Sequence, residues 1–240
     1  MNLDWQIFLT DDGSGRTYLE WMFEAWRWTL AVAGTSWVVA VSVGVLMGTL
    51  RTLPNSPWLV RLANVWVELF RNIPILVQIF LWYFVVPKMF PAFQQVPGFV
   101  LVVFALGFFT SARIAEQVRA GIQALPKGQR YAGMAMGFTT AQTYRYVILP
   151  MAFRIILPPL TSESMNLLKN SSVAFAVSIA ELTMFAMQAQ EETSRGVEVY
   201  LAVTALYALS AFAVNRVFAL IEKKVQIPGF VVAGAAGGGH

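Results

Sequence analysis

The chain of 240 residues contains no cysteine, and its one histidine is His240. The absence of cysteine excludes disulfides, thiolate nucleophiles and cysteine metal ligands, and one histidine is too few for the usual zinc sites. No lysine is followed by serine or threonine, which excludes a Walker A nucleotide site, and the chain has no G-x-S-x-G motif. We therefore predict no catalytic residue, no metal site and no cofactor bound by this chain.

Charged residues are also scarce. They make up 12% of the chain, against about 25% in soluble domains, whereas hydrophobic residues make up 57%. The net charge of +4 is scattered without a run of Lys or Arg, so nucleic acid is not an expected partner. The early residues Asp4, Asp11 and Asp12 are unlike the basic start of a secretory signal peptide. The composition predicts one membrane domain surrounded by lipid.

Long uncharged runs predict an all-α polytopic membrane protein with about five transmembrane helices. The first run, residues 28–50, carries no charge and is long enough to cross about 30 Å of hydrocarbon. The second run is long enough to cross the membrane only if it includes Glu68 and Arg71. These two residues lie three positions apart on one helix face and can pair. Pro74 is expected to bend this helix just after them. The remaining runs are residues 99–112, 147–168 and 199–215, with a re-entrant or short oblique helix over 170–180 and an acidic loop at Glu191, Glu192 and Glu198.

The predicted layout has three parts. Residues 1–28, rich in Trp and Tyr, are expected at the membrane interface, residues 29–226 form the transmembrane domain, and residues 227–240 form a flexible tail. The positive-inside rule orients the chain, because most loop Lys and Arg residues fall on the side that holds residues 128–150 and the C-terminus. That side is predicted to be cytoplasmic, and it receives Arg51, Arg61, Arg113, Arg119, Lys127, Arg130, Arg145, Arg216, Lys223 and Lys224, whereas the other side receives Arg16, Arg27, Lys88 and Arg195.

Residues 128–150, GQRYAGMAMGFTTAQTYRYVILP, differ from the apolar runs around them. Four small residues lie in the first half: Ala132, Gly133, Ala135 and Gly137. They leave one side of a short helix open to close approach by another protein. Gly137 is a typical helix C-cap, and Thr139 with Gln142 three residues later predicts a capping box that begins a second helix. The segment is predicted to be a docking element made of a helix, a turn and a second helix.

Charged residues inside the predicted spans are candidates for function, because an unpaired charge in lipid costs about 2.5–3.5 kcal/mol. Glu163 follows a predicted helix break at residues 158–159, and such breaks expose polar groups to a cavity in transporters. The sequence leaves open whether Glu68 and Arg71 act in function or only fix helix packing, and whether Ser171 and Ser172 bind substrate or satisfy backbone. The candidate pathway residues are Glu68, Arg71, Ser162, Glu163, Asn166, Lys169, Ser171 and Ser172.

The docking segment resembles the coupling motif of ABC importer membrane subunits, in which Glu-Ala-Ala is followed by Gly and then by Ile-x-Leu-Pro. Tyr131 stands in place of the Glu and Gly133 in place of the second Ala. The matching positions are Ala132, Gly137, Val147, Leu149 and Pro150. Three other phrases resemble the polar amino-acid uptake branch, and are most similar to glutamate/aspartate import permeases: VELFRNIP at 67–74, Glu116-x-x-Arg119, and LKNSS at 168–172.

The resemblance implies a type I ABC importer transmembrane domain in the bacterial inner membrane, and the orientation given by the positive-inside rule then places the N-terminus in the periplasm. It implies two cytoplasmic ABC ATPases that bind ATP-Mg, a periplasmic binding protein that delivers the amino acid, and a second permease chain. That chain would be a different one in a heterodimer, as in the glutamate/aspartate branch, or a second copy in a homodimer. The residues implied in ATPase coupling are Gly128, Tyr131, Ala132, Gly133, Gly137, Leu149 and Pro150.

A self-sufficient secondary carrier or channel, with Glu68 and Glu163 carrying protons, is the alternative function. It accounts equally well for the charged spans. It does not explain the docking segment, and such carriers are usually longer, with internal repeats, of which we find none. An intramembrane enzyme would need a catalytic constellation that the sequence lacks. The sequence therefore favours a permease subunit driven by a separate ATPase.

Overall fold

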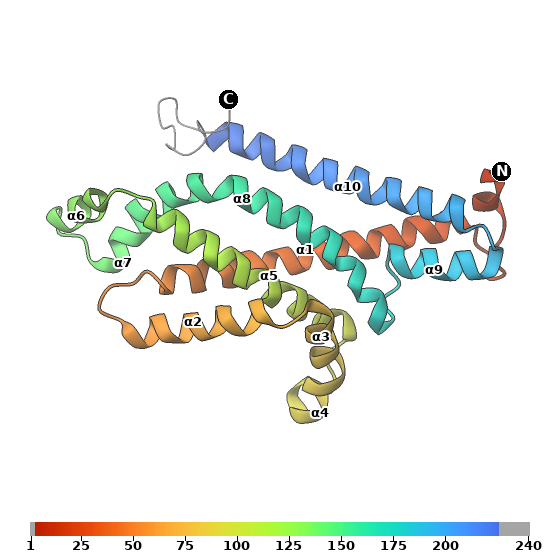
Figure 1. Ribbon diagram of the computed structural model, residues 1–240, viewed down its shortest axis with the longest axis horizontal. Coiled ribbons are helices and arrows are strands. Elements are labelled where there is room, and N and C mark those ends of the chain that lie inside the picture. The colour runs from red at the N-terminus through yellow and green to blue at the C-terminus, as the bar shows by residue number, and fades with distance from the viewer. Residues whose placement is uncertain (1–2, 226–240) are drawn as a thin grey trace.

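The computed structural model describes residues 3–225 as a bundle of helices, and Figure 1 shows the long helices running along one another. Residues 1–2 and 226–240, and with them the predicted tail at 227–240, lie outside the described residues. The described part of the chain has no β-strand, which confirms the all-α prediction. Its α-helices are α1 (Tyr18–Leu50), α2 (Pro57–Asn72), α3 (Ile75–Phe80), α4 (Val86–Met89), α5 (Gly98–Gln123), α6 (Lys127–Ala135), α7 (Thr140–Thr143), α8 (Leu149–Asn170), α9 (Leu182–Thr193) and α10 (Gly196–Val225).

Three of these helices, α1, α5 and α10, are long and apolar enough to cross a membrane. Two bent pairs of segments pass the same test together, so the number of candidate spans reaches five if each pair counts as one. The first pair is α2 with α3 and α4, and the second joins residues 140–177 to α9. The count agrees with the spans predicted from the sequence.

The α1 and α5 helices lie close together because glycines occupy their contact. A Cβ atom on Gly48 of α1 would lie 2.7 Å from the carbonyl oxygen of Ala115 on α5. A Cβ atom on Gly107 of α5 would lie 2.8 Å from Cβ of Val39 on α1. Small residues allow two backbones to approach, and such close packing is what holds helices together in lipid. This pair forms the centre of the bundle, and both α2 and α8 pack against it.

The chain turns sharply between α2 and α3, at an angle of 106°. Pro74 lacks a backbone N–H and favours an extended conformation at Ile73, whose φ and ψ are −94° and 130°. The buried side chain of Gln78 closes the bend, because its Nε2 donates to the carbonyl oxygens of Phe70 and Ile73 at 2.8 and 2.9 Å. The predicted bend at Pro74 is confirmed, and it directs α3 and α4 away from the long axis of the bundle (Figure 1).

The predicted helix break at Pro158 and Pro159 is wrong. Helix α8 continues from Leu149 to Asn170 with both prolines inside it. The two prolines remove only two backbone donors, while Ile156 and Leu160 are buried in a cluster with residues of α1 and α5 that holds this part of the helix in place. The α-helix ends later, at a 3₁₀-helix spanning Ser171–Val177, within the region where a short helix was predicted.

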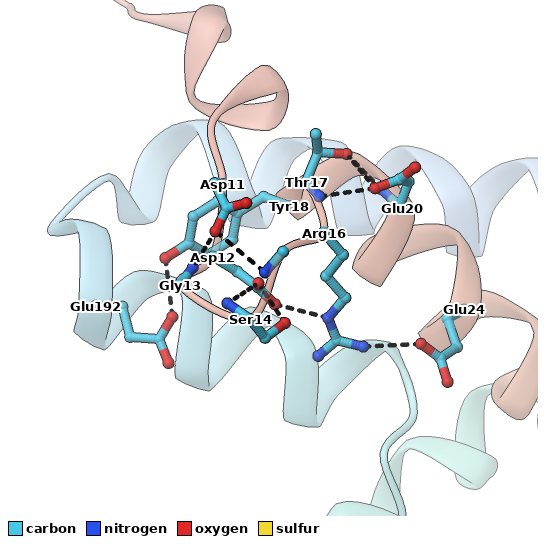
Figure 2. A network of polar contacts seen from close by, with 11 residues as sticks. Asp11, Asp12, Gly13, Ser14, Arg16, Thr17, Tyr18, Glu20, Glu24 and Glu192 are labelled. Carbon is cyan, nitrogen blue, oxygen red and sulfur yellow. Dashed lines mark hydrogen bonds and ion pairs between the residues drawn. The ribbon is translucent and has the colours of Figure 1, made fainter.

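The N-terminal segment folds back onto α9 and α10, as Figure 1 shows. Helix α1 begins at Tyr18, earlier than the predicted start at Trp28, because Thr17 and Glu20 form a capping box. Figure 2 shows the polar loop that precedes the helix. In that network the Tyr18 hydroxyl donates to Glu192 of α9 at 2.8 Å, which ties the loop to the far end of the chain.

The predicted acidic loop at Glu191, Glu192 and Glu198 is also wrong. The first two residues lie in the last turn of α9, and Glu198 lies in the first turn of α10. Glu198 is buried and accepts a hydrogen bond from the backbone N–H of Asp4 at 2.9 Å. Glu192 and Glu198 hold the N-terminal segment against the two helices.

Candidate functional site

An ion pair between α5 and α8 is the most buried charged contact among the predicted pathway residues. Nε of Arg113 lies 2.9 Å from Oε2 of Glu163, and its Nη2 donates to Oε1 at 3.0 Å. The second contact is a charge-assisted hydrogen bond, whereas Oε2 is buried without a hydrogen bond and is stabilised only by the nearby positive charge. The Glu163 side chain is 7% exposed, whereas that of Arg113 is 43% exposed. The arginine therefore neutralises a buried carboxylate while part of its guanidinium stays accessible.

Three predicted polar residues follow the accessible side of α8 next to this pair. Ser162 and Lys169 are exposed and Asn166 is half-buried. Their spacing of four and three residues places them on one helix face. These three side chains form a polar strip along the accessible side of α8, next to the buried Glu163 that pairs with Arg113 of α5.

The two predicted serines that follow α8 differ in their surroundings. Ser171 is buried and donates its hydroxyl to the carbonyl oxygen of Leu168 at 2.7 Å. This is the backbone-satisfying role, one of the two that the sequence leaves open. Ser172 is half-buried beside it.

The predicted pair of Glu68 and Arg71 is confirmed, with 3.3 Å between Oε1 and Nη2. Arg71 also reaches Glu116 of α5, where Nη1 lies 3.2 Å from Oε1. Glu116 has two further cationic neighbours, because Nη1 of Arg51 lies 3.0 Å from Oε1 and Nη1 of Arg119 lies 3.9 Å from Oε2. We name Arg51, Arg71, Arg119 and Glu116 the arginine cluster. It joins the end of α1 and the end of α2 to α5.

The docking segment forms the end of the bundle that holds α6 and α7 (Figure 1). Gly137 adopts φ +81°, and its N–H donates to the carbonyl oxygen of Met134 at 2.9 Å. The N–H of Phe138 donates to the carbonyl oxygen of Gly133 at 3.1 Å, which completes a Schellman motif. The predicted C-cap is therefore confirmed, as is the capping box of Thr139 with Gln142 at the start of α7.

The surface of this segment is apolar and basic. Tyr131 is 62% exposed and Met136 is 65% exposed. Gly133 faces inward, where a Cβ atom would lie 2.9 Å from Cγ2 of Thr143, so the small residue fixes α6 against α7. The other predicted coupling residues are also placed at this end: Gly128, Ala132, Gly137 and Pro150 are exposed, and Leu149 is half-buried.

Sequence reasoning missed Arg113 and Glu116 as site residues. It treated Arg113 only as a loop charge, although both lie inside a helix of 26 residues. The available signal was the spacing of Arg113, Glu116 and Arg119, which are three residues apart along α5. Charges at this spacing on a membrane helix indicate a polar face.

These features define a class: a polytopic helical membrane protein with charged residues on accessible faces of its spans and two short capped helices, α6 and α7, at one end. The comparisons with known proteins then identify the family. Residues 40–227 match the family described as the inner membrane component of binding-protein-dependent transport systems. The chain belongs to this family.

Named relatives match almost the whole chain. The glutamate/aspartate import permease protein GltJ of Escherichia coli is 41% identical over 242 residues, which cover 95% of this chain and 98% of that protein. The probable glutamine ABC transporter permease protein GlnM of Bacillus subtilis is 36% identical over 197 residues, which cover 82% of this chain and 87% of the relative. The chain is thus similar to permease subunits along its length.

Solved structures show the same architecture. A crystal structure of an amino acid ABC transporter with histidines contains a chain that is 30% identical, with a TM-score of 0.76, covering 93% of this chain and all of that one. An inward-facing structure of the MetNI methionine ABC transporter gives a TM-score of 0.71 at 21% identity, a likeness of fold alone. The fold is that of a type I ABC importer transmembrane domain, and the chain is a permease subunit in the inner membrane.

Proposed function

We propose that this chain is the permease subunit of an ATP-driven importer of acidic amino acids, glutamate and aspartate. The main structural support for this proposal is the ion pair of Arg113 and Glu163, because it places a carboxylate and an accessible guanidinium next to each other. The similarity to a glutamate/aspartate import permease over 95% of the chain supports the choice of substrate.

The pair suits an amino acid because the two have complementary charges. A carboxylate of the substrate would bind the accessible guanidinium of Arg113, and the ammonium group would then take the place of that guanidinium beside the buried Glu163, so that the substrate exchanges into an existing ion pair. Such an exchange avoids leaving a charge unpaired in the bundle, which would cost several kcal/mol. Ser162, Asn166 and Lys169 supply hydrogen-bond donors on the same face of α8.

The docking segment is the proposed contact with the cytoplasmic ATPases, which bind ATP-Mg. Its rigid turn at Gly137 and the packing of Gly133 on Thr143 allow α6 and α7 to move as one unit. When ATP draws the two ATPases together, this unit would transmit the movement to α5 and α8 and open the pathway toward the periplasm. A periplasmic binding protein delivers the substrate, and a second permease chain, a different one in a heterodimer or a second copy, completes the pathway.

Uptake of radiolabelled amino acids by cells lacking this chain tests the proposal, with arginine and glutamine as controls. We expect selective loss of glutamate and aspartate uptake, restored by the wild-type chain. If only the uptake of a different amino acid is lost, the proposed substrate is contradicted, whereas the role of the chain as an importer subunit is supported. Normal uptake of all four would contradict the proposed function. Transport by the purified chain alone in vesicles would favour the self-sufficient carrier instead.

A further inference from the structure

We propose that Arg71 and Arg119 of the arginine cluster form a second anion site, on the route by which the substrate leaves the Arg113–Glu163 pair toward the docking segment. The ligand class is the carboxylate of an anionic amino acid. This inference rests on the proposed function, because it needs an anionic substrate. It adds a site that holds the substrate after it has left the first one.

The charges around Glu116 do not balance. Three guanidinium groups surround Glu116, and the only other carboxylate in contact with them is Glu68, 3.3 Å from Arg71, among the residues that the structure describes. One positive charge is therefore left uncompensated. Along the chain, no acidic residue occurs between Glu116 and the end of the docking segment at Pro150, whereas four basic residues do: Arg119, Lys127, Arg130 and Arg145. The region between the pair and the docking segment attracts anions.

The three arginines of the cluster differ in how firmly their side chains are held. The Arg51 side chain is 5% exposed, and its Nε donates to Oδ1 of Asn64 at 2.7 Å, so this arginine has a fixed structural role. The side chains of Arg71 and Arg119 are 46% and 41% exposed. Arg119 lies 3.9 Å from Glu116, which is too long for a hydrogen bond. Its donors are thus accessible to a ligand, while Arg51 keeps Glu116 paired.

Along α5, Arg119 lies nearer to the docking segment than Arg113 does. Arg113 and Arg119 are six residues apart on α5, a distance of about 9 Å along a helix axis. The displacement is toward the C-terminal end of α5, which leads into α6. Six residues also turn the helix by about 120°, so a carboxylate released by Arg113 on the α8 side would move around α5 to meet Arg119 on the side of α1 and α2. Two guanidinium groups at this spacing allow an anion to move in short steps instead of crossing the interval unpaired.

The test uses the complete importer, with its ATPases and binding protein, reconstituted in proteoliposomes. The measured quantity is the number of glutamate molecules imported per ATP hydrolysed. We expect Arg119→Gln to lower this ratio about threefold to tenfold while ATP hydrolysis stimulated by the loaded binding protein stays normal. Arg119→Lys, which keeps the charge, should restore most of the ratio. The matched control is Arg154→Gln, which removes an exposed charge from α8 at a residue with no ion pair in the described part of the chain.

Three results would overturn the inference. The ratio could be unchanged in Arg119→Gln, it could fall equally in Arg154→Gln, or uptake and ATP hydrolysis could fall together without rescue by lysine, which indicates a purely structural residue. If Arg119→Gln does not fold, Arg71→Gln gives the same comparison at the other accessible arginine. Failure of the wild-type importer to take up any acidic amino acid would instead contradict the proposed function, so the two failures are distinguishable.

Discussion

Arg113 and Glu163 share an ion pair in which only one partner is accessible, since the arginine side chain is 43% exposed and the glutamate side chain 7%. The cost of losing the partner therefore differs between the two residues. Removing the arginine leaves a carboxylate buried without its partner. Removing the carboxylate leaves a guanidinium that is already accessible.

We expect Arg113→Leu to lower the melting temperature of the purified protein more than Glu163→Gln does. The larger loss follows from the unpaired buried carboxylate, whose cost is on the order of 3 kcal/mol. Both variants should lose uptake, because each removes one half of the proposed binding pair. Thermal unfolding in detergent and uptake in cells are the two measurements. Normal uptake by both variants would show that the pair only joins α5 to α8.

Two glycines of α1 offer a matched test of helix packing. Gly48→Ala should destabilise the protein by about 1–3 kcal/mol, because the new Cβ atom would lie 2.7 Å from the carbonyl oxygen of Ala115 and force α1 and α5 apart. Gly34→Ala in the same helix meets nothing within 4 Å and should be neutral or stabilising. Thermal unfolding of the two variants compares them directly. Equal melting temperatures would contradict this prediction, because they would show that the contact of α1 with α5 accommodates a methyl group at Gly48 without loss of stability.

The turn of the docking segment depends on the backbone of Gly137, whose φ is +81°. Gly137→Val should strain that turn by about 1–3 kcal/mol and lower both uptake and transport-coupled ATP hydrolysis, with no change in the affinity of the binding protein for its substrate. Ala124→Val places the same side chain on an exposed residue with φ −72° and serves as the control. Unchanged transport by Gly137→Val would contradict the role of this segment in coupling.

The loop before α1 should loosen in acid. Hydrogen bonds from Ser14 and Arg16 lower the pKa of Asp12 from 3.8 to about 2 (Figure 2). Because the pKa is lower in the folded chain, the stabilising contribution is complete above the unfolded value and is lost as the pH falls through about 2. We expect faster hydrogen exchange of residues 11–17 between about pH 4 and about pH 2, after correction for intrinsic rates. Asp12→Asn should abolish this pH dependence, and an equal dependence in that variant would assign it to another group.

Local features of the fold could be predicted from the sequence because their causes are local. The capping box of Thr139, the C-cap at Gly137 and the bend at Pro74 each depend on residues within a few positions, and all three are confirmed. The contact between Glu68 and Arg71 could be predicted for the same reason, because about one helical turn separates the two residues.

Contacts between distant residues could not be predicted in this way. Arg113 and Glu163 are 50 positions apart, and nothing in either segment specifies the other as its partner. The prolines of α8 were misjudged because a local rule for breaking helices was applied where Ile156 and Leu160 are held by other helices. The sequence predicts a loop for the acidic residues near 191–198, because the groups that Glu192 and Glu198 bind, such as the N–H of Asp4, come from the other end of the chain.

The contact of the N-terminal segment with the last helices determines when the bundle can be completed. Tyr18 bonds to Glu192, 174 positions away, and Trp26 bonds to Ser210, 184 positions away. During synthesis α1 enters the membrane long before α9 and α10 exist, so its aromatic residues can be buried only after the last part of the chain has been made. A chain that stops before α9 would keep the contact of α1 with α5 but leave Phe8 and Trp21 without the helices that bury them. The end of the bundle that holds the first residues is therefore the last to close.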